Sequence, residues 1–149
     1  MSKKLFKSVV VLTFVIYIGV LALLLILANR GGFSGDMSML EYAQSRFNII
    51  PFKTIIGYIT SFGTNGATAL KNIFGNFLLF LPMGIYLPYL FKKLSNYKSF
   101  LVVMLIILFA VEILQFVLKR GAFDIDDLIL NLLGAVIGFG LWKLINKKS

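Results

Sequence analysis

The sequence contains neither cysteine nor histidine. The absence of cysteine excludes disulfide bonds and thiol nucleophiles, and the absence of histidine excludes imidazole general bases and the usual zinc sites. A bound metal ion would need oxygen ligands, so Mg²⁺, Ca²⁺ or Mn²⁺ would be the candidates. Acids are also scarce, because six Asp and Glu stand against fifteen Lys and Arg, which leaves a net charge of +9. Any chemistry must therefore rest on a few carboxylates, amides and basic groups.

Charged residues of either sign make up only 14% of the 149 residues, whereas 59% are hydrophobic. Soluble domains are about one quarter charged and about one half apolar. A transmembrane helix needs about 20 consecutive, mostly apolar residues, and such stretches cover residues 8–29, 72–91, 99–118 and 128–145. The predicted fold class is an all-α integral membrane protein, a four-transmembrane-helix bundle that forms a single domain over residues 1–149.

The basic residues predict the orientation of the bundle. If the N-terminus is cytoplasmic, the cytoplasmic segments carry nine basic residues and no acid, and the remainder of the chain carries six of each. The nine are Lys3, Lys4, Lys7, Lys92, Lys93, Lys98, Lys143, Lys147 and Lys148. This asymmetry predicts a multi-pass protein with both termini in the cytoplasm. It also explains the net charge by topology and by contact with anionic lipid rather than by binding to nucleic acid.

The connection between the first two spans is predicted to lie on the outer side of the membrane. The stretch NRGGFSGDMS (residues 29–38) is rich in Gly and Ser and predicts irregular structure. The stretch NIIPFKTIIGYITSF (residues 48–62) is too short to span, but it carries seven large apolar side chains. It predicts an outer interfacial or re-entrant helix, with Pro51 near its start. The following GTNG (residues 63–66) predicts a turn.

Polar side chains of the last three spans are predicted to share one depth near the outer surface. At 1.5 Å per helical residue, Asn76 of the second span, Glu112 and Gln115 of the third and Asn131 of the fourth fall in a common layer. A carboxyl group in hydrocarbon costs roughly 2.5–3.5 kcal/mol on insertion scales, so Glu112 should face a protein interior, a partner or a wet cavity. The inner halves carry only apolar residues, Gly and Pro82. The pattern predicts a polar cavity that opens outward.

Two groups of candidate site residues follow from this layer and from the acidic stretch that precedes the last span. The candidate catalytic or metal-binding residues are Glu112, Asp124, Asp126 and Asp127. The candidate ligand-binding residues are Arg46, Asn76, Gln115, Arg120 and Asn131. Carboxylates of this kind could hold Mg²⁺ or another divalent cation that bridges phosphate oxygens. Arginines could contact the phosphate or carboxylate groups of a ligand.

Structural roles are the alternative for each of these features. An aspartate before the last span can cap that helix, and Asn72 and Asn76 can join helices by hydrogen bonds. Pro82 predicts a kink. Small residues favour close packing of helices, and the glycines interpreted in this way are Gly75, Gly84, Gly134 and Gly138.

Four blocks, in order, resemble the VanZ family of small bacterial membrane proteins. They are RFNIIPFKTI (residues 46–55), NIFGNFLLFLPMGIYLPYLF (72–91), EILQ (112–115) and RGAFDIDDLILNLLGAVIG (120–138). The resemblance implies a function at the bacterial cell envelope. The family takes its name from an accessory protein of glycopeptide-resistance clusters, linked to reduced susceptibility to teicoplanin, a lipid-tailed glycopeptide.

Three functions are compatible with these patterns. The first is binding of an amphiphile, such as a lipid-linked cell-wall precursor or a lipoglycopeptide, in a polar pocket at the outer leaflet. The second is a metal-dependent membrane enzyme that acts on a lipid-linked phosphate head group. The third is a structural scaffold of an envelope complex. Membrane lipid is a partner in all three, and a transporter is disfavoured because no polar path continues through the inner half.

Overall fold

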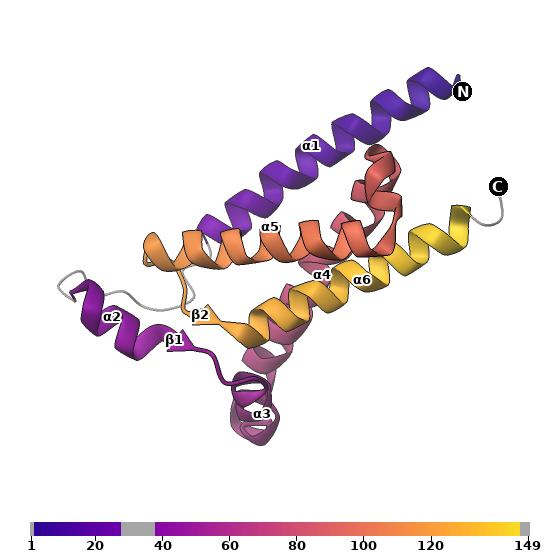
Figure 1. The fold of residues 1–149 in the computed structure, drawn as a ribbon. Coiled ribbons are helices and arrows are strands. Elements are labelled where there is room, and N and C mark those ends of the chain that lie inside the picture. Colours follow the sequence, from indigo (N-terminus) through magenta and orange to yellow (C-terminus); the bar gives the residue numbers. More distant parts are fainter. Residues whose placement is uncertain (1, 28–37, 147–149) are drawn as a thin grey trace.

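The computed structural model describes residues 2–27 and 38–146, and this part of the chain is almost entirely helical (Figure 1). The long helices are α1 (Lys3–Leu27), α4 (Phe62–Leu90), α5 (Tyr97–Val117) and α6 (Ile125–Asn146). The short elements are α2 (Met39–Arg46), β1 (Phe47–Asn48), α3 (Lys53–Thr60), the 3₁₀ turn η1 (Lys92–Ser95) and β2 (Phe123–Asp124). The all-α prediction is therefore confirmed.

Each predicted span corresponds to one long helix. Within the described ranges, four segments are long and apolar enough to cross a bilayer, namely Lys3–Leu25, Gly66–Leu90, Tyr97–Val117 and Ile125–Asn146. The predicted end of the first span at residue 29 lies outside the described residues, as do residues 29–37 of the Gly- and Ser-rich stretch. The four-helix membrane architecture is confirmed.

The start of α4 differs from the prediction. The helix begins at Phe62, ten residues before the predicted start, and the predicted turn at residues 63–66 is wrong because these residues are helical. The chain changes direction just before this stretch, at Ser61, where α3 ends. There the Ser61 N–H donates to the carbonyls of Gly57 and Ile59. Once the turn is made there, the glycines of GTNG continue as helix at a cost of about 1 kcal/mol each relative to alanine.

The connections alternate between the two ends of the bundle (Figure 1). The start of α1, the turn η1 and the end of α6 lie at one end, which we call the termini end. Helices α2 and α3 and the parallel pair β1–β2 lie at the opposite end, which we call the α3 end. In the short pair, Phe47 lies opposite Phe123 and their rings stack with centroids 4.7 Å apart.

Helices α4 and α6 form a close pair because glycines let their backbones approach. A Cβ atom on Gly134 would lie 2.0 Å from the Phe77 carbonyl oxygen, and one on Gly138 would lie 2.0 Å from the Leu81 carbonyl oxygen. Gly84 belongs to α4, and a Cβ atom on it would lie 2.0 Å from the carbonyl oxygen of Ala135 in α6. The packing role predicted for Gly84, Gly134 and Gly138 is confirmed.

Gly75 does not share this role. A Cβ atom there would meet nothing within 4 Å, so the packing role predicted for Gly75 is wrong. Gly75 lies on a part of α4 that borders a cavity beside α1. The kink predicted at Pro82 stays a prediction, and Pro82 lies inside α4.

The apolar core lies between α4, α5 and α6, and α1 adds little to it. Its fully buried members include Phe80 of α4, with Phe100, Met104 and Leu108 of α5. From α1, the buried residues are Leu21 and Leu25, which are one helical turn apart. The other large apolar residues of α1 are half-buried or exposed, as expected of a helix that faces lipid on most of its surface.

Candidate functional site

Six polar side chains are buried within the described part of the chain, and all six were predicted to lie in the polar layer or the acidic stretch. They are Asn76, Glu112, Gln115, Asp124, Asp126 and Asn131, which we call the polar cluster. They come from α4, α5, β2 and α6, in the portions of these elements nearest the α3 end. The burial of Glu112 agrees with the prediction that this carboxyl group does not face lipid, and the polar cavity that opens outward stays a prediction. The hydrogen-bond partners of the six groups show what each of them does.

Asp126 is fully buried and binds the start of α3. One carboxylate oxygen accepts the Phe52 N–H at 2.5 Å, and the other accepts the N–H groups of Thr54 at 2.8 Å and Ile55 at 3.1 Å. The remaining amide of the first turn, from Lys53, donates to the Ile50 carbonyl at 3.4 Å. The first amides of a helix lack intrahelical partners, so Asp126 caps α3 from a different helix.

The backbone at this cap is in an uncommon conformation. Phe52 has a φ of 65°, in the left-handed region that side-chain-bearing residues seldom adopt. Such a conformation costs of order 1–3 kcal/mol and persists where surrounding contacts hold it. The bond from the Phe52 N–H to the Asp126 carboxylate is such a contact.

Asp124 caps a different helix. One of its oxygens accepts the backbone N–H of Asp126 at 2.9 Å, which satisfies an amide at the start of α6. Its carboxylate also accepts the Thr54 hydroxyl at 2.6 Å and the Asn48 side-chain amide at 3.1 Å. Asp124 therefore joins the start of α6 to β1 and α3, and the capping role foreseen for one of the three aspartates is observed at Asp124.

Asparagines of α4 complete the connections at this end. The Asn76 side-chain amide donates to the Asp127 carboxylate, which links α4 to α6. The Asn72 amide donates to the Tyr58 hydroxyl at 2.9 Å, which links α4 to α3. Asn131 differs, because its buried Oδ1 atom has no hydrogen-bond partner among the described residues.

The metal hypothesis gains no support from these positions. Among the described residues, no three acidic side chains gather closely enough to hold a metal ion. Asp124 and Asp126 direct their oxygens at backbone and side-chain donors of α3, β1 and α6. Glu112 lies in α5 and is 1% exposed. Divalent-cation binding by Glu112 and the aspartates stays a prediction.

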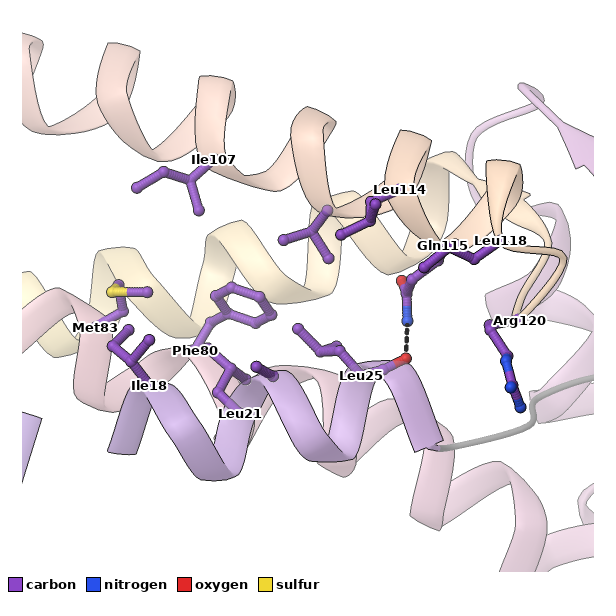
Figure 2. Close-up of a pocket in the computed structure, with 12 residues that line it drawn as sticks. Ile18, Leu21, Leu25, Phe80, Met83, Ile107, Leu114, Gln115, Leu118 and Arg120 are labelled. Carbon is purple, nitrogen blue, oxygen red and sulfur yellow. Dashed lines mark hydrogen bonds between the residues drawn. The ribbon is translucent and has the colours of Figure 1, made fainter. Parts of the chain in front are cut away.

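A cavity of about 220 Å³ lies beside the polar cluster, between α1, α4 and α5 (Figure 2). Its walls are apolar and include Leu21, Phe80, Met83 and Ile107. Figure 2 shows that Gln115, Leu118 and Arg120 lie at one end of the cavity. The cavity is therefore an apolar slot with polar groups at the α3 end only.

Gln115 closes this slot against α1. Its side-chain amide donates to the Leu25 carbonyl of α1 at 2.9 Å (Figure 2). The backbone carbonyl of Gln115 accepts the backbone N–H of Arg120 at 2.8 Å. Arg120 is exposed and lines the same end of the slot as Gln115.

The predicted ligand-binding residues thus separate into two places. Gln115 and Arg120 line the slot, whereas Asn76 and Asn131 are buried in the polar cluster. Arg46 is the last residue of α2 and does not line the slot. Helix α1 was not predicted to form a wall of this site. The signal available was the spacing of Ile18, Leu21, Ala22 and Leu25, which repeats every three to four residues and places them on one helix face.

Four long apolar helices with a buried polar cluster at one end define a small multi-pass α-helical membrane protein. The sequence profile of the VanZ/LLP1 family matches residues 14–146. Protein VanZ of Enterococcus faecium is 32% identical over 111 residues, which cover 74% of this chain and 61% of that protein. The chain belongs to the VanZ/LLP1 family. The match spans about three fifths of that relative's length, and no solved structure matches the chain.

Proposed function

We propose that this VanZ-family protein binds an amphiphile at the bacterial cell envelope, with the apolar tail in the slot between α1, α4 and α5. The observation that carries the proposal is the slot itself, which is apolar along its walls and ends at Gln115 and Arg120. An acyl chain matches the walls, and an anionic or polar head group matches the guanidinium at the mouth.

The size of the slot supports a tail rather than a whole ligand. Sites that enclose a drug-sized ligand measure about 300–1,000 Å³. A cavity of about 220 Å³ is smaller, so a large head group would remain outside, beside Arg120. Each methylene group transferred from water would contribute about 0.8 kcal/mol to binding, so even a short tail provides useful affinity.

We further propose that the α3 end faces the outside of the cell. The described lysines at the termini end are Lys3, Lys4, Lys7, Lys92, Lys93, Lys98 and Lys143, and the positive-inside rule assigns such an end to the cytoplasm. In this orientation the slot opens at the outer leaflet, where lipid-linked cell-wall precursors and lipoglycopeptides are exposed. The family resemblance makes teicoplanin, which carries a lipid tail, the first ligand to test, and a contribution to teicoplanin resistance is part of the proposal.

The test is equilibrium binding of teicoplanin to the detergent-purified chain. Ala22→Trp places a large ring in the slot and should abolish binding, whereas Leu23→Trp, on an exposed position of the same helix, should bind like the unmodified protein. Arg120→Gln should weaken binding at least about tenfold, because hydrogen bonds to charged groups contribute about 1.5–3 kcal/mol. Arg46→Gln is the matched control, since Arg46 does not line the slot.

Equal effects of the variants and their controls, or no saturable binding of either teicoplanin or a lipid-linked precursor, would contradict the proposal. A lipid-linked precursor titrated in the same way identifies the ligand if teicoplanin does not bind but the precursor does.

One observation favours a structural scaffold as the second candidate. The carboxylates of Asp124 and Asp126 are occupied by six hydrogen bonds that join α3, β1 and α6. A scaffold would keep its function when a side chain fills the slot, but it would lose function when the hydrogen bonds of the polar cluster are removed. Ala22→Trp with normal envelope function, combined with loss of function and of protein level in Glu112→Gln, would favour the scaffold. The metal-dependent enzyme has no comparable observation in its favour among the described residues.

A further inference from the structure

We infer that a second lipid site, separate from the slot, lies at the termini end and binds an anionic phospholipid of the bilayer. The site is a groove of about 360 Å³ between the first half of α1 and the last part of α4. Its lining includes Phe6, Val10, Thr13, Pro82, Tyr86 and Tyr89. The rings of Phe6 and Tyr89 meet edge to face with centroids 6.2 Å apart, which fixes the groove beside the start of α1 and the end of α4.

The interior of the groove suits an acyl chain. Thr13 is its polar residue on α1, and the Thr13 hydroxyl bonds within its own helix, 3.0 Å from the Val10 carbonyl and 3.1 Å from that of Val9. The side chain therefore presents its methyl group rather than a free hydroxyl. Pro82 has no backbone N–H to offer at all. A hydrocarbon chain could therefore lie against Thr13 and Pro82 without burying a free donor of either residue.

The end of the groove carries positive charge. Lys3 precedes Phe6 by three residues in α1, so helical spacing places it on the face that carries Phe6, Val10 and Thr13. Lys92 follows Tyr89 by three residues and begins η1, the turn that comes directly after α4. The described residues of this end include no acid that could neutralise these lysines.

This charge selects the occupant. A lysine near a membrane surface contributes about 1 kcal/mol toward an anionic lipid, and its long stem lets the ammonium reach the head-group layer. A second copy of the chain would bring lysines against lysines at a symmetric contact, which is repulsive. The favourable ligand is therefore a phospholipid with its acyl chain in the groove and its anionic head group between Lys3 and Lys92.

The experiment is native mass spectrometry of the full chain released from nanodiscs that contain equal amounts of phosphatidylglycerol and phosphatidylcholine. The measured quantity is the ratio of the two lipids retained. Lys3→Gln with Lys92→Gln should lower the preference for phosphatidylglycerol about tenfold. Lys98→Gln with Lys143→Gln is the matched control, since it removes the same charge from the same end, on α5 and α6, and should leave the preference nearly unchanged.

A filling variant tests the apolar part of the site. Thr13→Trp should reduce retention of both lipids, and Ile16→Trp, at an exposed position of the same helix outside the groove, should not. Absence of a preference in the unmodified chain, or equal loss in both lysine pairs, would overturn the inference. So would a change in the proportion of dimer, without a change in lipid retention, on Thr13→Trp, because the groove would then be a contact between chains.

Discussion

Asp126 is a buried side chain of one helix that caps the start of another. A carboxylate at a helix start ordinarily caps its own helix, and the sequence position of Asp126 suggests that role. The structure assigns the capping of α6 to Asp124, two residues earlier, and directs Asp126 at the amides of α3. The acidic stretch therefore needs several carboxylates because they stabilise different helices.

We expect Asp126→Asn to destabilise the protein by about 2 kcal/mol or more, because it removes the charge and one of two acceptor oxygens from three amides. Thermal unfolding in detergent measures the loss. The control is Glu41→Gln, which alters an exposed cap of α2 and should have a much smaller effect. An unchanged unfolding temperature in Asp126→Asn would show that the cap of α3 does not contribute to stability.

Glu41 gives a pH-dependent prediction outside the membrane spans. Its carboxylate accepts the Ser38 N–H at 2.8 Å, and bonds to Ser38 lower the Glu41 pKa below its usual 4.5. Because the pKa of Glu41 is lower in the folded state, the ionised carboxylate stabilises α2 at every pH above the pKa of Glu41 in the unfolded chain. This stabilisation is lost as the pH falls through the lower pKa of Glu41 in the folded protein. NMR titration of α2 should show its first turn opening below pH 4.5. The same transition in Glu41→Gln would assign it to another group.

The helices of the bundle differ in how closely they pack. Helix α4 contacts α6 backbone to backbone through three glycines, Gly84, Gly134 and Gly138. Helix α1 instead contacts its neighbours through side chains, namely two buried leucines, ring contacts with Tyr86 and Tyr89 of α4, and a few polar links. One link joins the Tyr17 hydroxyl to the Leu79 carbonyl at 2.6 Å, and another joins Gln115 to Leu25. Cavities border α1 on both sides because few of its side chains reach the core.

Two glycine substitutions test this difference. Gly138→Ala should destabilise the protein by about 1–3 kcal/mol, because the new Cβ would lie 2.0 Å from the Leu81 carbonyl oxygen and the helices must separate. Gly75→Ala meets open space and should be neutral or stabilising by up to about 1 kcal/mol, since alanine favours a helix. Detergent unfolding compares the two. Equal behaviour would mean that the α4–α6 contact adapts freely.

At the scale of the whole molecule, the two ends of the bundle have different chemistry. The α3 end holds the polar cluster and the end of the slot that Gln115 and Arg120 line, and the termini end holds lysines and the second groove. Among the described residues, lysines without nearby acids at one end and hydrogen-bonded carboxylates at the other make the two ends of the molecule chemically different. We propose that this asymmetry sets both the orientation and the leaflet that each groove faces.

The lack of cysteine allows a direct test of orientation. Thr60→Cys, at the end of α3, should react with a membrane-impermeable thiol reagent in intact cells. Ser95→Cys, in η1, should react only after the cells are permeabilised, because η1 is at the termini end. The unmodified chain is the control, since it has no thiol. The reverse pattern would place the termini outside and move the slot to the inner leaflet.

The sequence alone determined the features that a bilayer imposes on each segment separately. The length of an apolar run predicts a span, and the cost of burying Glu112, Gln115 or Asn131 predicts that they face protein rather than lipid. These rules act on one helix at a time, so neither a partner nor a distance is needed. They identified four helices and the buried polar residues, and the resemblance of four sequence blocks identified the family.

Only the tertiary structure decided which groups meet. The amide of Phe52 reaches the Asp126 carboxylate across 74 positions of sequence, and the Leu25 carbonyl reaches Gln115 across 90. Gly75 and Gly138 are the same residue type on apolar helices, yet one faces open space and the other a backbone oxygen. Such outcomes depend on how helices rotate and cross. That geometry is set by the joint packing of many side chains, which no local pattern encodes.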